Sequence, residues 1–416
     1  MSMDKVILGE NVFFSSDCDE TGINNNIIVC GGSGSGKTMS ISEARLLETF
    51  NSSLIVTATK RRIVNKYKEV FKKRGYKVYD LNFTNPSESD ISFDPMYYID
   101  DNKDIRFLAE SIVMSDARKE KTTADPFWDE AAISLLSAEI ALIRMSDSRA
   151  SFADVLRLHD KLEIWEYGSN ISSSFDDRFN NLSHKHPGCF AVSCWKTFSS
   201  LPMRTAGCVY GALNATIDTI FSSDVRKMIA MNKKVDFEEL ANEKTVLFVS
   251  TSAVNPAINC FVNLFYSQVF KSLFEYAESL PGAILPRPVH ILCDDFATGS
   301  KILNFPEYIS VFREKQISVT LLLQSESQLE HIYGSEDATT IINNCDTYLF
   351  MGGMDLKTGR SVSERLNAPL EDVLYMPIGQ EVIFRRGQRP IITQRYDIKK
   401  NSMFQKITKE FEMAGR

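Results

Sequence analysis

The 416-residue sequence lacks several features that would place it in a special class of protein. It has no run of 18 uninterrupted apolar residues, the length that a membrane-spanning helix needs. The acidic N-terminal segment MSMDKVILGENVFFSSDCDE holds no long apolar core, so it does not resemble a secretory signal. Repeats and low-complexity linkers are also absent. With 44% hydrophobic and 24% charged residues, the composition excludes disordered, collagen-like and coiled-coil chains.

Excess positive charge and a high cysteine density are missing as well. The net charge is −7, so the surface as a whole is not that of a nucleic-acid binder, and any DNA contact has to be local. Eight cysteines in a chain of this length do not form a disulfide framework, which favours a reducing cytoplasm. The segment HKHPGCFAVSC gathers four metal-ligating side chains, although their spacing fits no standard zinc pattern and an ordinary loop before a helix is the alternative. These four are His184, His186, Cys189 and Cys194.

Short β-branched runs alternate with helical periods, which predicts an α/β fold with a mostly parallel sheet. This alternation stops between Asp100 and Phe198, where the patterns are helical only. In DPFWDEAAISLLSAEIALIRM, Asp125 is the expected N-cap and Pro126 suits the first turn. We therefore expect a nucleotide-binding domain in two parts, 1–100 and 201–416, with an all-α domain inserted at 101–200. The expected strands are Asn26–Cys30, Ser53–Thr57, Lys77–Asn82, Thr245–Thr251, Val289–Asp294, Ser318–Leu323, Thr347–Met351 and Gln380–Arg385.

The strongest motif is a glycine-rich loop between an apolar strand, NIIVC, and a helix-compatible stretch, MSISEARLLETF. Its glycines let backbone N–H groups turn toward phosphate oxygens at a helix N-terminus. In the pattern G-x4-G-K-[ST], the lysine reaches the β- and γ-phosphates of ATP and the hydroxyl residue binds Mg²⁺. The alternative is a chance match, which the flanking strand and helix disfavour. The loop comprises Gly31, Gly32, Ser33, Gly34, Ser35, Gly36, Lys37 and Thr38.

A second motif, VHILCDD, is an apolar strand that ends in two acids. An ATPase with such a loop needs a strand-end carboxylate near Mg²⁺, the role we expect for Asp294. Asp295 is then placed to polarise the attacking water as a general base. Many such ATPases carry Glu there, and Asp reaches roughly 1.5 Å less far, a displacement that can cost about 10²-fold in rate. Two solvated acids at a strand end are the alternative.

Two further polar residues flank the apolar strand ISVTLLL. Gln324 ends this strand, and strand C-termini face the nucleotide crevice in a parallel sheet. We therefore expect Gln324 to sense the γ-phosphate or to orient water. Arg313 precedes the strand and is a candidate arginine finger acting on a neighbouring subunit. A solvated helix residue paired with Glu314 is the other interpretation of Arg313.

Together these elements resemble the type IV secretion coupling proteins, the TraG/TraD-like conjugative DNA-transfer ATPases. The resemblance rests on GGSGSGKT, DPFWDEAAISLL, CDDF, NFPEYISVFREKQISVTLLLQSESQL, YGSEDATTIINNCDTYLFMGG and MPIGQEVIFRRGQRPIITQRYD. It implies a RecA-like P-loop ATPase domain with an inserted all-α domain, in a hexameric ring that hydrolyses ATP between subunits. Lys37 and Thr38 match the Walker A pair, Asp294 the Walker B acid and Asp295 the catalytic position. Arg313 matches the family's arginine finger, and Gln324 its glutamine sensor.

The function that this resemblance implies is DNA transfer driven by ATP and Mg²⁺. The ATPase, stimulated by DNA, would recruit relaxase-bound single-stranded DNA, or a protein substrate, to a type IV secretion channel. Three departures stand out: the family's two N-terminal transmembrane helices are absent before the loop, Thr57-Ala-Thr-Lys60 replaces Asp-Pro-Lys, and Asp295 replaces Glu. We expect a cytoplasmic protein that reaches the inner face of the bacterial plasma membrane through a partner. The alternatives are a nucleotide-dependent docking module with little hydrolysis and a DNA-pumping ATPase outside secretion.

DNA could touch one basic block, Lys60 to Lys77, which holds nine Lys or Arg against one Glu. Its apolar residues recur at helical spacing, so an amphipathic helix with a solvated charged face is the simpler interpretation. A patch that binds DNA phosphates is the alternative. Core packing explains Trp128, Trp165 and Trp195 better than base stacking does.

Overall fold

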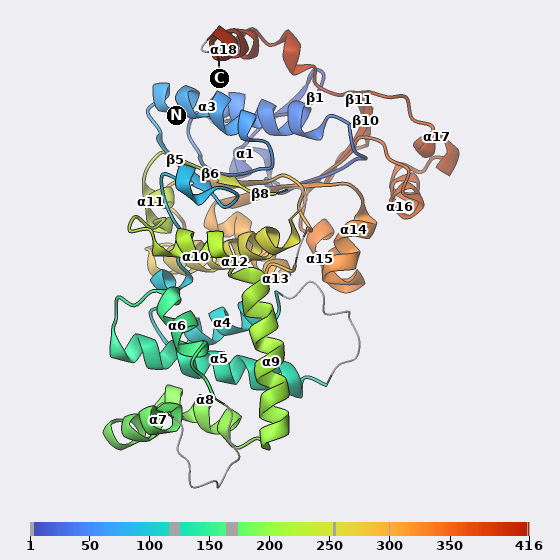
Figure 1. Cartoon of the computed structure of the whole chain (residues 1–416). Helices are drawn as coiled ribbons and strands as arrows, with labels where there is room; N and C mark the ends of the chain where they lie inside the picture. Colours follow the sequence, from blue (N-terminus) through green and yellow to red (C-terminus); the bar gives the residue numbers. More distant parts are fainter. Residues whose placement is uncertain are drawn as a thin grey trace.

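The protein is described here by a computed structural model, which covers residues 4–115, 125–163, 174–252, 255–298, 300–413 and 415. A nine-stranded sheet lies at its centre in the order β11-β10-β9-β3-β8-β7-β4-β6-β5 (Figure 1). From β9 to β5 all neighbouring strands run parallel, whereas β10 and β11 are antiparallel. The strands are β3 (Ile27–Cys30), β4 (Ser53–Ala58), β5 (Lys77–Asn82), β6 (Thr245–Ser250), β7 (Val289–Cys293), β8 (Ile317–Leu323), β9 (Thr347–Phe350), β10 (Gln380–Arg385) and β11 (Ile391–Gln394).

All eight expected strands are present, so the α/β prediction with a mostly parallel sheet is confirmed. Three strands were not predicted: β11 and the hairpin of β1 (Lys5–Gly9) and β2 (Val12–Ser15). β2 and β11 have no fully buried residue, and β1 alternates exposed and buried positions. They therefore lack the continuous apolar run that marks a strand covered on both faces.

Helices cover both faces of the sheet. In β3, Ile27 and Val29 join the core on one face, and Ile28 and Cys30 join the core on the other. The first face packs against α2 (Ala44–Glu48) and α3 (Arg61–Lys73), and the second packs against α12 (Pro256–Ser279). Figure 1 shows α3 and α12 on opposite sides of the sheet. The other helices outside the helical insertion are α1 (Cys18–Thr21), α13 (Phe305–Val311), α14 (Glu326–Tyr333), α15 (Ser335–Asn343), α16 (Leu356–Leu366), α17 (Leu370–Leu374) and α18 (Ser402–Met413).

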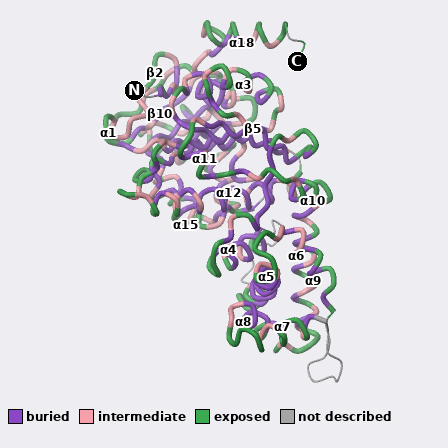
Figure 2. The backbone as a smooth tube through the Cα atoms, turned by 90° about the vertical axis from the view of Figure 1, so that its left-hand side faces the viewer, coloured by how far each residue is buried: buried purple, intermediate pink, exposed green. Residues whose placement is uncertain are grey.

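Between β5 and β6 the described residues form helices and no strand. α5 is buried along its middle, from Ala131 to Leu142, because other helices surround it (Figure 2). The division at residues 100 and 200 stays a prediction, and the helices run on to Asn242. They are α4 (Asn102–Val113), α5 (Phe127–Ser146), α6 (Phe152–His159), α7 (Ser174–Lys185), α8 (Phe190–Ser199), α9 (Met203–Ile220), α10 (Ser223–Ala230) and α11 (Phe237–Asn242).

Two local expectations need correction. α5 begins with Pro126 as its N-cap, although the Asp125 carboxylate still accepts the N–H of Phe127 at 3.0 Å. Core packing holds for Trp195, whose ring stacks on Phe179 at 4.6 Å between centroids. It is wrong for Trp128, which is 46% exposed because it lies in the first turn of α5, before the buried part of the helix. Trp165 lies outside the described residues. None of the described helices is long and apolar enough to cross a membrane.

The N-terminal hairpin is anchored by a buried acid that the sequence did not reveal. The Asp4 carboxylate accepts the N–H groups of Phe50, Asn51 and Ser52 at 2.8, 2.9 and 3.0 Å. Burial alone would raise the pKa of Asp4, but the charge of Arg45 and these hydrogen bonds lower it overall. Asp4 thereby fixes the loop that follows α2. The helix that begins directly after the glycine-rich loop ends with α2, so Asp4 holds the far end of that helix in place.

Replacing this acid should destabilise the fold. Asp4→Ala leaves three N–H groups, one of them buried and two partly buried, without their charged acceptor, so we expect the free energy of unfolding to fall by about 3 kcal/mol. Because the folded-state pKa lies below the ordinary value, this stabilisation is present above pH 3.8 and is lost as the pH falls through the folded pKa. Urea unfolding at several pH values measures both effects. The exposed Asp19→Ala variant should change stability by no more than about 0.5 kcal/mol, and an equal loss in both variants would contradict the assignment.

Candidate functional site

The glycine-rich loop lies at the carboxyl edge of the sheet, between β3 and η1 (Thr38–Glu43), a short π-helix that continues into α2. The Gly31 N–H donates to Leu323 O at 3.2 Å, and the Gly32 N–H donates to Gly352 O at 2.8 Å. These carbonyls belong to the end of β8 and to the segment after β9. The strands on both sides of β3 therefore hold the start of the loop in place.

Arg395 supports the other end of the loop, and sequence reasoning missed it. Its guanidinium donates to Ser35 O at 2.7 Å. Gly36 has φ +97°, and a Cβ there would fall 2.8 Å from Arg395 Nη1. Gly36 is thus required both by its backbone conformation and by the arginine packed against it. Arg395 directly follows β11, so predicting that strand would have brought the arginine to this edge.

Lys37, Thr38 and Asp294 meet as the two motifs predict. Lys37 Nζ donates to Gly31 O and to Gly32 O, the second at 3.2 Å, so the ammonium lies within the loop. Thr38 Oγ1 donates to Asp294 Oδ2 at 3.3 Å. Burial raises the pKa of Asp294 to about 6, and the negative charge of Asp295 adds to the rise. Burial also lowers the pKa of Lys37, although both aspartates oppose that shift.

The pair formed by Thr38 and Asp294 fits a magnesium ion. Mg²⁺ prefers hard oxygen ligands and keeps several waters, so one hydroxyl and one carboxylate are a typical protein contribution. The residue Asp294 is only 8% exposed, and no described cation forms an ion pair with its carboxylate. A bound cation would restore its ionised form, and this donor set can therefore hold Mg²⁺ beside a phosphate chain.

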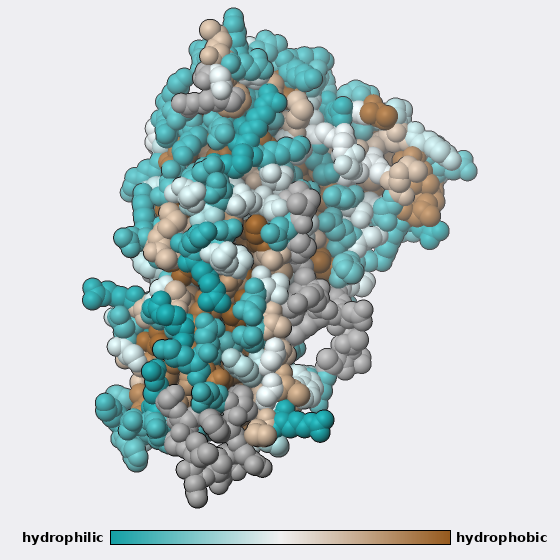
Figure 3. All heavy atoms as spheres, in the orientation of Figure 1, coloured by the Kyte–Doolittle hydropathy of each residue, from teal (hydrophilic) through white to brown (hydrophobic). Residues whose placement is uncertain are grey.

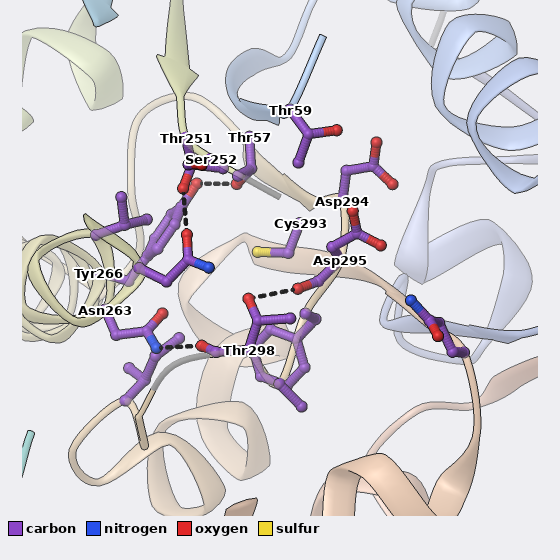
Figure 4. A pocket seen from close by; sticks show the side chains of 16 residues that line it. Thr57, Thr59, Thr251, Ser252, Asn263, Tyr266, Cys293, Asp294, Asp295 and Thr298 are labelled. Atoms are coloured by element: carbon purple, nitrogen blue, oxygen red, sulfur yellow. Dashed lines mark hydrogen bonds between the residues drawn. The ribbon is translucent and has the colours of Figure 1, made fainter. Parts of the chain in front are cut away.

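Asp295 and Gln324 line one cavity of about 130 Å³ between the carboxyl ends of the strands and α12. Figure 4 shows the two aspartates side by side at the end of β7, with Thr57, Thr251 and Tyr266 on the far wall. The Thr251 hydroxyl bonds Asn259 at 2.6 Å, and the Thr57 hydroxyl bonds Tyr266. The cavity therefore offers several polar groups and is large enough for water next to the Asp295 carboxylate.

The backbone of Asp295 adopts a left-handed conformation, with φ 54°. A residue with a Cβ seldom does so, at a cost of about 1 kcal/mol or more, and such residues cluster at functional sites. The Thr298 hydroxyl donates to Asp295 O at 3.0 Å and helps to hold this turn. The conformation sets the direction of the shorter aspartate side chain at the position where many ATPases carry Glu.

Arg313 does not join this group. It lies in η4 (Phe312–Lys315), before the N-terminal end of β8, while Gln324 follows the C-terminal end. At about 3.3 Å per residue, the strand separates the two by roughly 20 Å. Arg313 is exposed and forms no ion pair with Glu314 or with any other described residue. An arginine at this edge cannot reach the loop of its own chain.

An exposed apolar surface adjoins the loop. Met354 is 87% exposed, Tyr375 82% and Ile378 98%, and they lie on the segments around α16 and α17. Figure 3 shows apolar side chains gathered on this projection, at the right of the molecule. Gly352, which accepts a hydrogen bond from the glycine-rich loop, is two residues from Met354. Exposed apolar clusters of this kind mark interaction surfaces.

The remaining candidates do not form sites. No group of three or more His, Cys, Asp or Glu residues among those described is placed to hold a metal ion, and this includes His184, His186, Cys189 and Cys194.

The basic helix α3 buries Ile63, Val64, Tyr67 and Phe71 as its period predicts. Most of the nine cations from Lys60 to Lys77 pair with acids or backbone carbonyls, which favours the solvated-face interpretation. Those paired are Arg61, Lys66, Lys68, Lys72, Lys73, Arg74 and Lys77.

A glycine-rich loop between strand and helix, a lysine within it and a carboxylate on a neighbouring strand define a P-loop nucleotide-binding site on a RecA-like sheet. A family model described as type IV secretory system conjugative DNA transfer matches residues 4–368. The chain therefore belongs to that family, and the resemblance inferred from its motifs is confirmed.

Solved structures of similar fold agree with this assignment. The bacterial conjugative coupling protein TrwB, in an unbound form, has a TM-score of 0.71 at 16% identity, covering 95% of this chain and 88% of that chain. TrwB with the ATP analogue ADPNP has a TM-score of 0.68 at 17% identity, with 89% and 85% covered. VirB4 of Thermoanaerobacter pseudethanolicus has a TM-score of 0.58 at 12% identity, with 97% and 99% covered. At such identities the likeness establishes the fold. No curated protein sequence gives a significant match.

The raised pKa of Asp294 predicts a pH dependence of Mg²⁺–nucleotide binding. A cation binds the ionised carboxylate, so affinity should fall about tenfold per pH unit once the pH drops below about 6. Calorimetric titration with Mg·ATP between about pH 5 and pH 8 measures the effect. Because ATP itself takes up protons in this range, the quantity compared is the difference between the wild type and Asp294→Asn. The variant should bind more weakly at neutral pH and lose the extra slope; the same slope in both proteins would assign the titration to another group.

Proposed function

We propose that this protein is an ATPase that couples nucleotide hydrolysis to conjugative DNA transfer. The observation that carries the proposal is the cluster of Lys37, Thr38, Asp294 and Asp295, which come from two separate motifs and meet at one sheet edge. ATP would bind with its phosphates in the loop Gly31–Thr38. Mg²⁺ would neutralise the charge that develops on the phosphate oxygens during transfer.

Each residue has a distinct role in this proposal. Lys37 exchanges its bonds to Gly31 O and Gly32 O for bonds to the β- and γ-phosphates. Thr38 and Asp294 would hold the magnesium ion. Asp295 would accept a hydrogen bond from the attacking water and take its proton as the new oxygen–phosphorus bond forms and the bond from the γ-phosphorus to the bridging oxygen of ADP breaks, so that ADP leaves. Gln324, on the wall of the same cavity, orients that water or reports the presence of the γ-phosphate.

The family supplies the cellular task. Membership in the conjugative DNA transfer family supports a role in moving DNA, and TrwB is described as a plasmid coupling protein bound to ADPNP or to ADP and Mg²⁺. We infer that this chain uses the same two ligands and hands single-stranded DNA, with its attached relaxase, to a type IV secretion channel. DNA would stimulate hydrolysis, because turnover without a substrate would waste ATP.

The separation of Arg313 from the loop supports assembly into a ring. A cation near the γ-phosphate stabilises the transition state, and Arg313 can supply it only to the site of an adjacent copy. The exposed side chains of Met354, Tyr375 and Ile378 beside the loop provide apolar area for such a contact. We therefore propose a homo-oligomer, and a hexamer by the family resemblance, in which each active site lies between two copies.

The first test is ATPase activity as a function of protein concentration. The specific activity should rise with concentration, since each site needs a second copy, and single-stranded DNA should raise it further. Phosphate release by the purified protein gives both dependences. Lys37→Ala is the control and should be inactive at every concentration. Absence of Lys37-dependent turnover with and without DNA would sink the ATPase proposal.

A mixing experiment tests the role of Arg313. Arg313→Ala subunits keep an intact loop but supply no finger, whereas Lys37→Ala subunits supply a finger but lack a competent loop. Each variant alone should be about 10³-fold or more slower than the wild type. A mixture should recover activity, because Lys37→Ala subunits donate Arg313 to the loops of their neighbours. Variants that form oligomers together but recover nothing would show that Arg313 has a structural role.

A further inference from the structure

A second and larger cavity, of about 650 Å³, lies on the face of the sheet that α3 covers, whereas the cavity of Asp295 and Gln324 lies on the other face, against α12. Its walls come from three parts of the chain that are distant in sequence: η1, the start of α3, and the segment that holds η5 (Ile398–Lys400) and α18. Figure 1 shows α18 at the top of the molecule, above α3. Thr38 and Met39 line the cavity, so it opens directly beside the last residues of the glycine-rich loop. We call this cavity the α18 cleft.

The lining of the α18 cleft combines an apolar surface with polar groups. Met39, Ile63 and Phe404 supply the apolar part. Thr408 lines the cleft too, and its hydroxyl oxygen is buried without a hydrogen-bond partner in the described structure. Gln405 adds an amide. Ligand sites for small organic molecules have this character and volume, with mostly apolar walls and a few placed polar groups.

Positive charge also gathers at the cleft. Lys60 and Arg62 are the cations of the basic segment whose side chains form no hydrogen bond or ion pair with the described residues, and both line the cleft. Lys399 and Lys409 lie on the wall opposite. Two acids also line the cleft, Glu412 and Glu43, of which Glu43 is paired with Lys66 at 3.0 Å. Five cations against two acids leave a positive balance. Such a balance attracts an anionic ligand to the cleft mouth.

Lys66 joins all three walls. Its ammonium lies 3.0 Å from the Glu43 carboxylate of η1 and 3.5 Å from the centre of the Phe404 ring of α18. Beyond this, few polar contacts hold α18 on α3: Lys73 pairs with Glu410 at 3.0 Å, and Arg74 donates to Met403 Sδ at 3.1 Å. α18 lies beyond residue 368, where the family match ends, so the outer wall of the cleft belongs to this chain's own C-terminal segment.

We propose that the α18 cleft binds the nucleoside of ATP, with the ribose over Met39, the base against Phe404, and Gln405 and Thr408 at the polar edge of the base. This inference rests on the proposed function. A triphosphate held in the loop must leave it near Thr38 and Met39, and the cavity on the other side is too small for a nucleoside. The unpartnered Thr408 hydroxyl then gains a hydrogen-bond partner from the base. The C-terminal helix thus determines which nucleotide the site prefers.

Two ligands separate the nucleoside from the phosphates: Mg·ATP and inorganic tripolyphosphate with Mg²⁺. Thr408→Trp fills the cleft with an indole, so it should weaken ATP binding about tenfold or more and leave tripolyphosphate binding unchanged. The matched control is Lys406→Trp on the same helix, because Lys406 is exposed and does not line the cleft. Lys37→Ala should lose both ligands. Calorimetric titration of the full chain gives every affinity.

The outcomes are distinct. Unchanged ATP affinity in Thr408→Trp would overturn the proposal, and so would an equal loss of ATP and tripolyphosphate, which indicates damage to the loop instead. Thr408→Val keeps the side-chain volume and removes only the hydroxyl, so a selective loss for ATP in that variant supports contact with the base without any change in packing. The proposed ATPase function fails by a different result, namely nucleotide binding and turnover that do not depend on Lys37.

Discussion

The parallel pairing of β3, β8 and β7 is the constraint on which the whole site depends. Cys30 pairs with Leu323, and Leu321 pairs with Cys293, so the three strands end at the same edge. The glycine-rich loop, Gln324 and the two aspartates each follow one of these ends directly. A shift of one residue in either pairing would turn the side chains of a strand to the opposite face and separate the catalytic groups.

Buried polar side chains fix this register inside an apolar sheet. His290 of β7 bonds Ser318 at 2.8 Å and Thr320 at 3.0 Å, both on β8. Burial lowers the pKa of His290 well below its ordinary value, so the ring is neutral and can serve both hydroxyls. Asn26, just before β3, accepts the N–H of Val319 at 3.1 Å and so links β3 to β8. Apolar strands alone could slide along one another, whereas these bonds form in one register only.

The sequence was sufficient to predict those parts of the fold and site whose pattern lies within one continuous segment of the chain. The apolar strands, the glycine-rich loop and the two aspartates were predictable because strand, loop and carboxylates are continuous in the sequence. The supporting elements were not. β11 is only half buried, so neither the strand nor the position of Arg395 beside the loop was predicted. Trp128 was assigned to the core from its residue type, although its place in the first turn of α5 leaves it exposed. The contact of Arg395 with the loop is long-range and lies outside any short window of sequence, whereas the exposure of Trp128 depends on which turns of α5 the neighbouring helices cover.

Charge is distributed to match this architecture. Acids of neighbouring elements form ion pairs with most of the cations along α3. The unpaired positive charge therefore remains at the start of the helix, beside the glycine-rich loop. Arg313 sits at the opposite edge, where its charge has no partner among the described residues. One chain therefore presents an almost complete site at one edge and the missing cation at the other, an arrangement suited to head-to-tail contact between copies.

The bond from Arg395 to Ser35 joins residues 360 positions apart in the chain. During synthesis the glycine-rich loop leaves the ribosome well before Arg395, because 360 residues separate the arginine from Ser35. Contacts of such long sequence range form late and slowly, because the intervening chain must be ordered first. A nascent chain therefore has no finished phosphate-binding loop until synthesis has passed Arg395. Nucleotide binding can thus serve as a sign that the sheet has folded as far as β11 and the arginine that follows it.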